Sequence, residues 1–200
     1  MPLLYDPFLL FAELRGLRRL RSELVGQAGG RVVELGAGTG LNMKHYVGVE
    51  RLVLTEPEPG MATRLEQRLE RSAVRGEVVT APAEQLPFDD GSFDTVVATL
   101  VFCTVSDPHG ALRETRRVLA PGGRLLFLEH VRADAGSRLE LWQDRSYRPW
   151  RAFAYGCRCN QRTLELIGAA GLRATEVGTA RWRGMPQIVH PIVYGKAETV

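Results

Sequence analysis

The sequence predicts an α/β fold with a largely parallel sheet. Three observations indicate this. Short apolar segments alternate with amphipathic segments, a glycine-rich loop follows the first apolar segment, and two strand-like segments close the chain. A chain of 200 residues can bury its own core, and no linker or repeat divides it, so we expect a single domain over residues 1–200.

Residues 3–25 are expected to form one or two amphipathic helices, because leucines recur there at spacings of three and four. This N-terminal helical cap, residues 1–28, would pack against the sheet. The alternative is a basic helix that rests on anionic lipid or covers a substrate entrance. Tyr5 precedes the helix and could reach over a ligand.

The glycine loop follows the apolar segment 32–35, which has the composition of a buried central strand. Gly36, Gly38 and Gly40 let the backbone turn tightly and approach a ligand, before a helix that we expect to start near residues 41–43. The spacing GxGxG is not that of a nucleotide-triphosphate loop, and an ordinary glycine-rich turn is the alternative.

Glu56 ends the second predicted strand, residues 51–55, and lies 20 residues after Gly36 (56 − 36). At this separation, a carboxylate in a dinucleotide-type fold accepts hydrogen bonds from a ribose. The alternative is a solvent-exposed acid at a strand end. Together with the glycine loop, Glu56 predicts an adenosyl ligand over the carboxyl end of the sheet.

The remaining elements follow from periodicity and turn residues. We expect helices at 61–73, 108–119 and 160–170, the last capped by Asn160, and strands at 78–79, 93–100, 124–129, 172–179 and 188–194. Between them, residues 132–160 interleave aromatic residues with arginines. This pattern favours a packed helical face or a substrate lid over a surface for single-stranded nucleic acid.

The composition is that of a soluble globular protein. The net charge of +3 is too small for a broad nucleic-acid footprint, so we expect no nucleic-acid partner. Cys103, Cys157 and Cys159 form no paired CxxC units, which predicts neither a disulfide framework nor a metal site. No signal peptide or membrane span is indicated, so we expect a cytoplasmic protein.

The segments VVELGAGTG, TEPEPGM, AEQLPFDDGSFDTVVA and RRVLAPGGRLLFLEH resemble the class I S-adenosylmethionine-dependent methyltransferases, type 11 domain. The resemblance implies a Rossmann-like seven-stranded sheet, mostly parallel with an antiparallel last strand, with helices on both faces. It also implies S-adenosylmethionine as cofactor and S-adenosylhomocysteine as product.

A closer resemblance is to the methyltransferase-like group that includes alkyl-thiol S-methyltransferases. GLNMKHY, TLVFCTV, FLEHV, WQDRSYRPWRAFAYGC and HPIVYGKA carry it. Animal members of that group have a hydrophobic N-terminal anchor that is missing from this sequence, so membrane-surface contact is not favoured here.

The resemblance implies a set of cofactor-binding residues. They are Tyr5, Glu34, Gly36, Ala37, Gly38, Gly40, Asn42, Glu56, Pro57, Ala83, Glu84, Thr99 and Leu100. One position departs from the family pattern: Pro82 stands where many relatives have an acid that holds the adenine amino group. Proline has neither carboxylate nor N–H, so Glu84 or a backbone carbonyl would have to replace that contact.

His130, with Glu129 beside it, is the candidate acid/base or positioning group, and a structural histidine is the alternative. The candidate substrate pocket consists of Phe102, Cys103, Trp142 and Trp150. We therefore expect a metal-free methyltransferase acting on a small molecule, with a thiol as favoured acceptor. The alternatives are a phospholipid or quinone methyltransferase and a non-catalytic S-adenosylmethionine-binding regulatory module. The sequence leaves the oligomeric state open.

Overall fold

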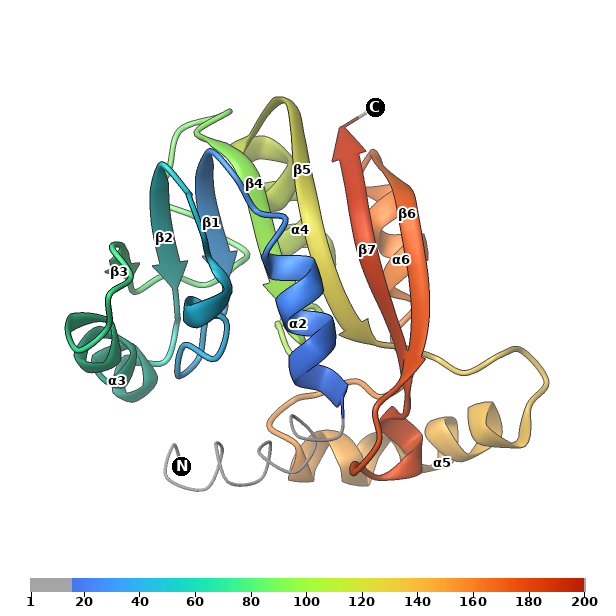
Figure 1. Ribbon diagram of the computed structural model, residues 1–200. Coiled ribbons are helices and arrows are strands. Elements are labelled where there is room, and N and C mark those ends of the chain that lie inside the picture. The colour runs from blue at the N-terminus through green and yellow to red at the C-terminus, as the bar shows by residue number, and fades with distance from the viewer. Residues whose placement is uncertain (1–15, 200) are drawn as a thin grey trace.

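The computed structural model describes residues 16–199 and has a seven-stranded sheet of order β3-β2-β1-β4-β5-β7-β6 (Figure 1). The strands are β1 (Arg31–Leu35), β2 (Arg51–Thr55), β3 (Glu77–Val79), β4 (Phe93–Thr99), β5 (Leu119–His130), β6 (Leu172–Arg181) and β7 (Pro191–Thr199). Strands β1 to β5 run parallel to one another, and β7 is antiparallel to both of its neighbours, β5 and β6. The predicted fold class is confirmed. Tyr5 and most of the predicted N-terminal helix lie outside the described residues.

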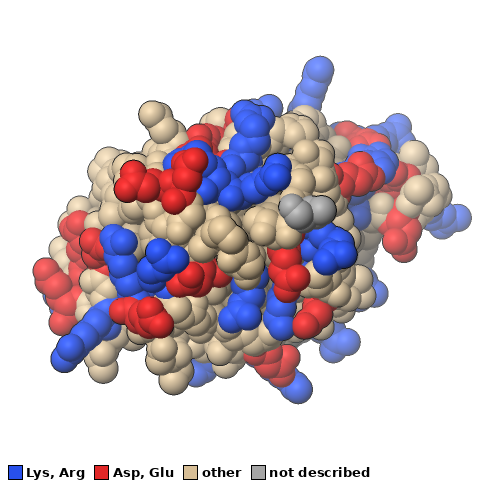
Figure 2. All heavy atoms as spheres, turned by 90° about the horizontal axis from the view of Figure 1, so that it is seen from above, with Lys and Arg blue, Asp and Glu red and all other residues tan. Residues whose placement is uncertain are grey.

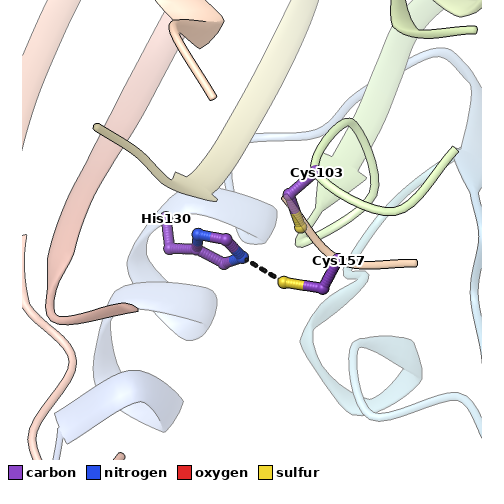
Figure 3. A group of neighbouring side chains, drawn as sticks. All are labelled: Cys103, His130 and Cys157. Atoms are coloured by element: carbon purple, nitrogen blue, oxygen red, sulfur yellow. Dashed lines mark hydrogen bonds between the residues drawn. The ribbon is translucent and has the colours of Figure 1, made fainter. Parts of the chain in front are cut away.

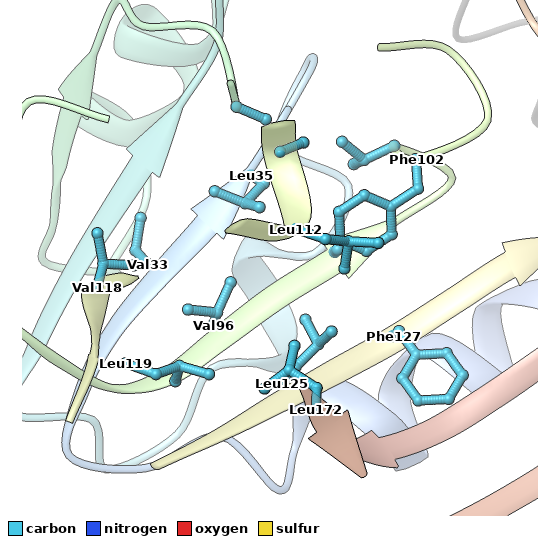
Figure 4. Close-up of a cluster of buried hydrophobic side chains, with 14 of the residues drawn as sticks. Val33, Leu35, Val96, Phe102, Leu112, Val118, Leu119, Leu125, Phe127 and Leu172 are labelled. Atoms are coloured by element: carbon cyan, nitrogen blue, oxygen red, sulfur yellow. The ribbon is translucent and has the colours of Figure 1, made fainter. Parts of the chain in front are cut away.

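Helices cover both faces of the sheet (Figure 1). They are α2 (Arg18–Val25), α3 (Pro59–Glu70), α4 (Pro108–Val118), α5 (Arg138–Phe153) and α6 (Thr163–Ala169), with 3-10 turns η2 (Met43–His45) and η3 (Gln187–Val189). Because strand side chains alternate between faces, Val32 packs with Leu24 of α2, whereas Val33 packs with the cluster that contains Leu112 of α4 (Figure 4). Burial on both faces explains the continuous apolar runs of the central strands.

The prediction of a helix that starts near residues 41–43 is wrong, because only the short turn η2 forms there. The side chain of Asn42 is hydrogen-bonded to Glu34 and Thr99, and Tyr46 leaves the turn in an extended conformation with its hydroxyl on Glu34. Gly48 then adopts a positive φ of 67°. The extended backbone of Tyr46 and the positive φ of Gly48 end the turn, so no α-helix continues from it.

Other predicted boundaries also differ. The strand predicted at 188–194 starts later, because residues 187–189 form the turn η3, and β7 runs from Pro191 to Thr199. Asn160 does not cap α6: its amide donates to Asp144 of α5 (2.9 Å), and the helix begins later, at Thr163. Strand β5 begins at Leu119 rather than Arg124, because the chain pairs with Phe93 before a register shift carries the proline and glycines of the turn past β4.

Figure 2 shows the end of the molecule at which the parallel strands begin. Cationic and anionic side chains intermingle on this surface. Asp94 of β4 pairs there with Arg31 of β1 at 2.8 Å, and the Arg31 guanidinium holds the pKa of Asp94 at about 2. Within residues 16–199, no helix is long and apolar enough to cross a membrane.

Helix α5 lies across the carboxyl end of the sheet (Figure 1) and is fixed there by the fully buried Gln143. Its amide nitrogen lies 2.8 Å from the carbonyls of Cys159 and Ile188 and 3.1 Å from that of Val131. Its amide oxygen accepts the N–H of Ala133 at 2.8 Å. Gln143 therefore joins α5 to three separate segments of chain.

Replacing Gln143 with alanine is expected to lower the free energy of unfolding by about 2–4 kcal/mol, because several buried backbone groups lose their partner. Urea unfolding measures this. Leu141 of the same helix is 62% exposed, so Leu141→Ala is the control, with an expected change within about 0.5 kcal/mol. Equal effects of the two substitutions would contradict the role of Gln143.

Candidate active site

Four parallel strands end at one edge of the sheet, and the predicted site residues follow them there. The glycine loop leaves β1, Glu56 follows β2, Leu100 follows β4, and Glu129 and His130 end β5. Ligands in open α/β sheets bind at this edge. The topology therefore brings together segments that are nearly a hundred residues apart in the sequence.

Gly36, Gly38 and Gly40 all have positive φ values, of 54°, 59° and 82°. A Cβ on Gly36 would lie 3.2 Å from Val101, and one on Gly40 would lie 2.5 Å from the sulfur of Met43. The N–H of Gly38 donates to Glu56 at 2.9 Å. Glycine is thus required by backbone conformation throughout the loop and also by packing at its two ends.

Glu34 lies beneath the glycine loop and is 1% exposed. It accepts hydrogen bonds from the Tyr46 hydroxyl (2.6 Å) and the Asn42 amide (2.8 Å), and Asn42 also donates to Thr99 at 3.0 Å. Burial raises the pKa of Glu34 to about 7, although both hydrogen bonds lower it. The Glu34 carboxyl group is therefore expected to lose its proton near neutral pH rather than near its ordinary pKa of 4.5.

Arg21 of α2 is part of this network, although the sequence analysis did not name it as a site residue. Its guanidinium donates to Thr99 (2.7 Å) and Asn42 (3.1 Å), and the residue is only 4% exposed. It lines a cavity of about 30 Å³ with Glu34, the glycine loop and Thr99. The available signal was spacing: Arg21 follows Leu17 by four and precedes Leu24 by three, which puts it on the leucine face.

Glu56 is 6% exposed and accepts hydrogen bonds from the backbone N–H groups of Gly38 and Glu58 at 2.9 and 3.0 Å. Burial raises its pKa. The two N–H donors fix a carboxylate at the end of β2, beside the glycine loop. This is the position that binding of a ribose requires.

On the next side of the site, Ala83 is buried and Pro57 is exposed. Glu84 accepts hydrogen bonds from the N–H groups of Ser106 (2.8 Å) and Asp107 (3.1 Å). Its carboxylate therefore fastens the loop before α4. Both N–H groups donate to the same oxygen, and the role of Glu84 as the substitute for the acid that Pro82 replaces stays a prediction.

The segment after β4 is held by Glu129, which is fully buried. Leu100 has a strained φ of 61° and donates its N–H to Leu128 at 2.8 Å. The N–H groups of Val101 and Phe102 both donate to one oxygen of Glu129, at 2.7 and 3.0 Å. Its other oxygen is buried without a partner, and burial raises the pKa of Glu129 to about 7.

His130 meets two cysteines at this edge (Figure 3). Its Nε2 lies 3.0 Å from Cys157 Sγ, and one nitrogen of the ring and the sulfurs of Cys103 and Cys157 lie within 4.8 Å of one another. The indole N–H of Trp150 donates to Cys157 at 3.2 Å. Cys159, the neighbour in sequence of Cys157, lies apart with its thiol on the Gln143 carbonyl.

The structure thus pairs Cys157 with Cys103 and His130 rather than with Cys159. Cys103 is 54 positions away in the chain (157 − 103), so sequence spacing carries no signal for this group. Of the other predicted pocket residues, Phe102 is fully buried in the core, whereas Trp142 is 47% exposed. Trp142 is therefore not buried as Phe102 is, and the pocket assignment stays a prediction.

A model of the methyltransferase domain matches residues 33–127. The chain is 38% identical over 157 residues to the human thiol S-methyltransferase TMT1B, covering 77% of this chain and 62% of the human protein. It is 31% identical over 194 residues to the rat protein of that name, covering 94% and 76% of the two chains. A SAM-dependent methyltransferase structure from Thermotoga maritima has the same fold, with a TM-score of 0.70, 24% identity and coverage of 98% and 94%.

The raised pKa of Glu34 makes a prediction about stability. Between its unfolded pKa of 4.5 and its folded pKa of about 7, the folded protein holds a proton that the unfolded chain has released. The free energy of unfolding therefore falls as the pH rises through this range, by at most about 3 kcal/mol from this group.

Urea unfolding of the ligand-free protein at about pH 5 and pH 8 tests this, with Glu34→Gln for comparison. The variant has no proton to lose at this position. Over the same range, the fall in its free energy of unfolding is therefore expected to be about 2–3 kcal/mol smaller than that of the wild type. Equal pH dependence in both proteins would show that Glu34 is ionised throughout.

Proposed function

Since the chain belongs to the class I S-adenosylmethionine-dependent methyltransferases, in the group of the thiol S-methyltransferases, we propose that it methylates the sulfur of a small-molecule thiol. The observation that carries the choice of acceptor is the extent of the similarity. The match to the rat thiol S-methyltransferase spans 94% of this chain and so extends well beyond the methyltransferase-domain match at residues 33–127. The later part of the chain supplies His130, α5 and Cys157, which we assign to the acceptor side of the site.

The described residues fit the cofactor. The glycine loop would let the backbone approach the cofactor, and the Ala83 N–H would face the adenine. The Glu56 carboxylate, held by the N–H groups of Gly38 and Glu58, would accept hydrogen bonds from the ribose hydroxyls. Arg21 would bind the carboxylate of the methionine part, beside Asn42 and Thr99. When bound, the cofactor supplies an activated methyl group on a sulfonium, which is a good leaving group.

The protein itself must orient the acceptor sulfur and keep water away. Glu129 positions the segment after β4, and buried side chains such as Phe102 exclude solvent from its end. A thiol has a reference pKa of about 8.5 and is partly ionised near neutral pH, so a strong general base is unnecessary. We therefore favour a positioning role for Glu129 over an acid/base role.

A screen for release of S-adenosylhomocysteine from S-adenosylmethionine tests the acceptor class. Small alkyl and aryl thiols are expected to give turnover, and the matched alcohols and phenols are not, because only the sulfur ionises readily near neutral pH. Turnover with quinones or phospholipid head groups and with no thiol would refute a thiol acceptor. Binding of S-adenosylmethionine without turnover of any acceptor would favour a regulatory module.

Two substitutions separate the ends of the cofactor site. Glu56→Ala is expected to weaken binding of both S-adenosylmethionine and 5′-methylthioadenosine by about 1–3 kcal/mol, since both contain the ribose. Arg21→Met should weaken binding of S-adenosylmethionine by a similar amount and leave 5′-methylthioadenosine unaffected, because that nucleoside has no carboxylate.

Isothermal titration calorimetry measures these affinities, with the exposed Glu66→Ala on α3 as control. Unchanged affinity in Glu56→Ala would refute the ribose assignment. Equal losses for the two ligands in Arg21→Met would mean that Arg21 supports the site and does not bind the carboxylate.

A further inference from the structure

Cys103, His130 and Cys157 form a closed group of soft ligands from three different segments (Figure 3). Cys103 follows β4, His130 ends β5, and Cys157 follows α5. Their side chains point toward one another, and the residues are 1%, 1% and 7% exposed. Two sulfurs and an imidazole nitrogen are the donors that Zn²⁺ and other thiophilic cations prefer.

The spacing suits a tetrahedral ion. Bonds of about 2.3 Å to sulfur and 2.0 Å to nitrogen place ligand atoms roughly 3.5–3.8 Å apart. In the group, His130 Nε2 and Cys157 Sγ are 3.0 Å apart, and all three atoms fall within 4.8 Å of one another. Shifts of less than about 1 Å in side-chain position would therefore admit the ion.

Hydrogen bonds of Arg158 join the segment that contains Cys103 to the segment that contains Cys157, without any contribution from the two sulfurs. The N–H of Arg158 donates to the Cys103 carbonyl at 2.7 Å. Its guanidinium donates to the carbonyls of Val105 (2.5 Å) and Ser106 (2.8 Å). Cys103 and Cys157 therefore face each other because the surrounding backbone holds them there, which is the preorganisation that a metal site requires.

The hydrogen bonds around the group leave its facing atoms available to an ion. His130 directs Nε2 toward the sulfur of Cys157, and its other ring nitrogen, Nδ1, is buried without a hydrogen-bond partner. Cys157 also accepts the indole N–H of Trp150, a contact that stabilises a thiolate. Cys157 Sγ thus accepts a hydrogen bond and lies 3.0 Å from His130 Nε2, so its surroundings suit a sulfur that binds a cation.

We propose that Cys103, His130 and Cys157 bind a thiophilic divalent cation, Zn²⁺ by its donor preference, and that the fourth position on the ion takes the acceptor sulfur. The proposal that these residues bind a metal ion rests on their geometry. Only the proposal that the ion binds the acceptor thiol rests on the proposed function. Three protein ligands with one open position are the arrangement of catalytic zinc sites, whereas structural sites have four.

The position of the group fits this use. Cys103 lies two residues after Val101, whose side chain faces Gly36 of the cofactor loop. As the acceptor thiol binds the ion, it would release its proton to solvent. A lone pair of the sulfur then forms the bond to the methyl carbon, the bond from that carbon to the sulfonium sulfur breaks, and its electron pair stays on S-adenosylhomocysteine. Charge and atoms balance without an oxidant or a reductant.

Metal titration of the full chain, purified with a reductant and stripped by a chelator, tests the site. Co²⁺ is the probe, because tetrahedral thiolate ligation gives intense visible and near-ultraviolet absorption, and Zn²⁺ should displace it. We expect one Co²⁺ per chain in the wild type. Cys103→Ser and Cys157→Ser should weaken binding at least 100-fold, and Cys159→Ser, a buried cysteine outside the group, should not.

Failure of the wild type to bind Co²⁺ or Zn²⁺ would overturn the proposal, as would an equal loss in Cys159→Ser and Cys157→Ser. X-ray absorption at the zinc edge of the wild type needs no variant, so it remains decisive if a substitution prevents folding. It should give two sulfur neighbours, and three after addition of a thiol acceptor. A sulfur count that stays at two would refute the acceptor role.

Release of S-adenosylhomocysteine separates this inference from the proposed function. If the stripped enzyme methylates thiols at the full rate, the metal inference fails and the proposed function stands. If Zn²⁺ binds with two sulfur ligands but no thiol is methylated, the metal site stands and the proposed function fails.

Discussion

The contact between the buried carboxylate of Glu129 and the backbone of the segment after β4 is the constraint on which the site depends. One oxygen accepts two successive N–H groups, those of Val101 and Phe102. Those N–H groups leave the sheet where β4 ends, so no neighbouring strand satisfies them. The carboxylate thereby sets the path of the chain past the glycine loop and directs Cys103 toward His130. Its burial makes the interaction strong and makes an ionised Glu129 costly.

Much of the fold could be predicted from the sequence because its signals are local. The apolar run before Gly36, the acid at Glu56 and the alternation of strands and helices each depend on neighbours in the chain. The missing helix after the loop shows the limit of such signals. Residues 41–46 have an acceptable helical pattern, but Asn42 and Tyr46 gain more from the buried Glu34 carboxylate than from another turn of helix.

The site was predicted less completely because its key contacts are not local. Arg21 reaches Thr99 across 78 positions, and Glu84 is taken up by N–H groups beyond β4. Cys159 is the cysteine nearest to Cys157 in the sequence, but the return of the chain after α5 puts Cys103 beside Cys157 instead. A group of residues from distant segments has no fixed spacing in the sequence, so it cannot be predicted from a motif. The loop from Gly36 to Gly40, in contrast, is complete within five residues.

The attachment of α5 has a kinetic consequence. The first half of α5 is held by the fully buried amide of Gln143 and by the ion pairs of Arg132 with Glu140 and Asp144, so this half resists swinging open as a hinged flap. Lifting it would require a local unfolding event, which is rare. Acceptor and product would then pass around the first half of this helix. The width of that passage, rather than the speed of a closing movement, would limit the size of molecule that reaches the sulfur ligands and the rate at which the product leaves.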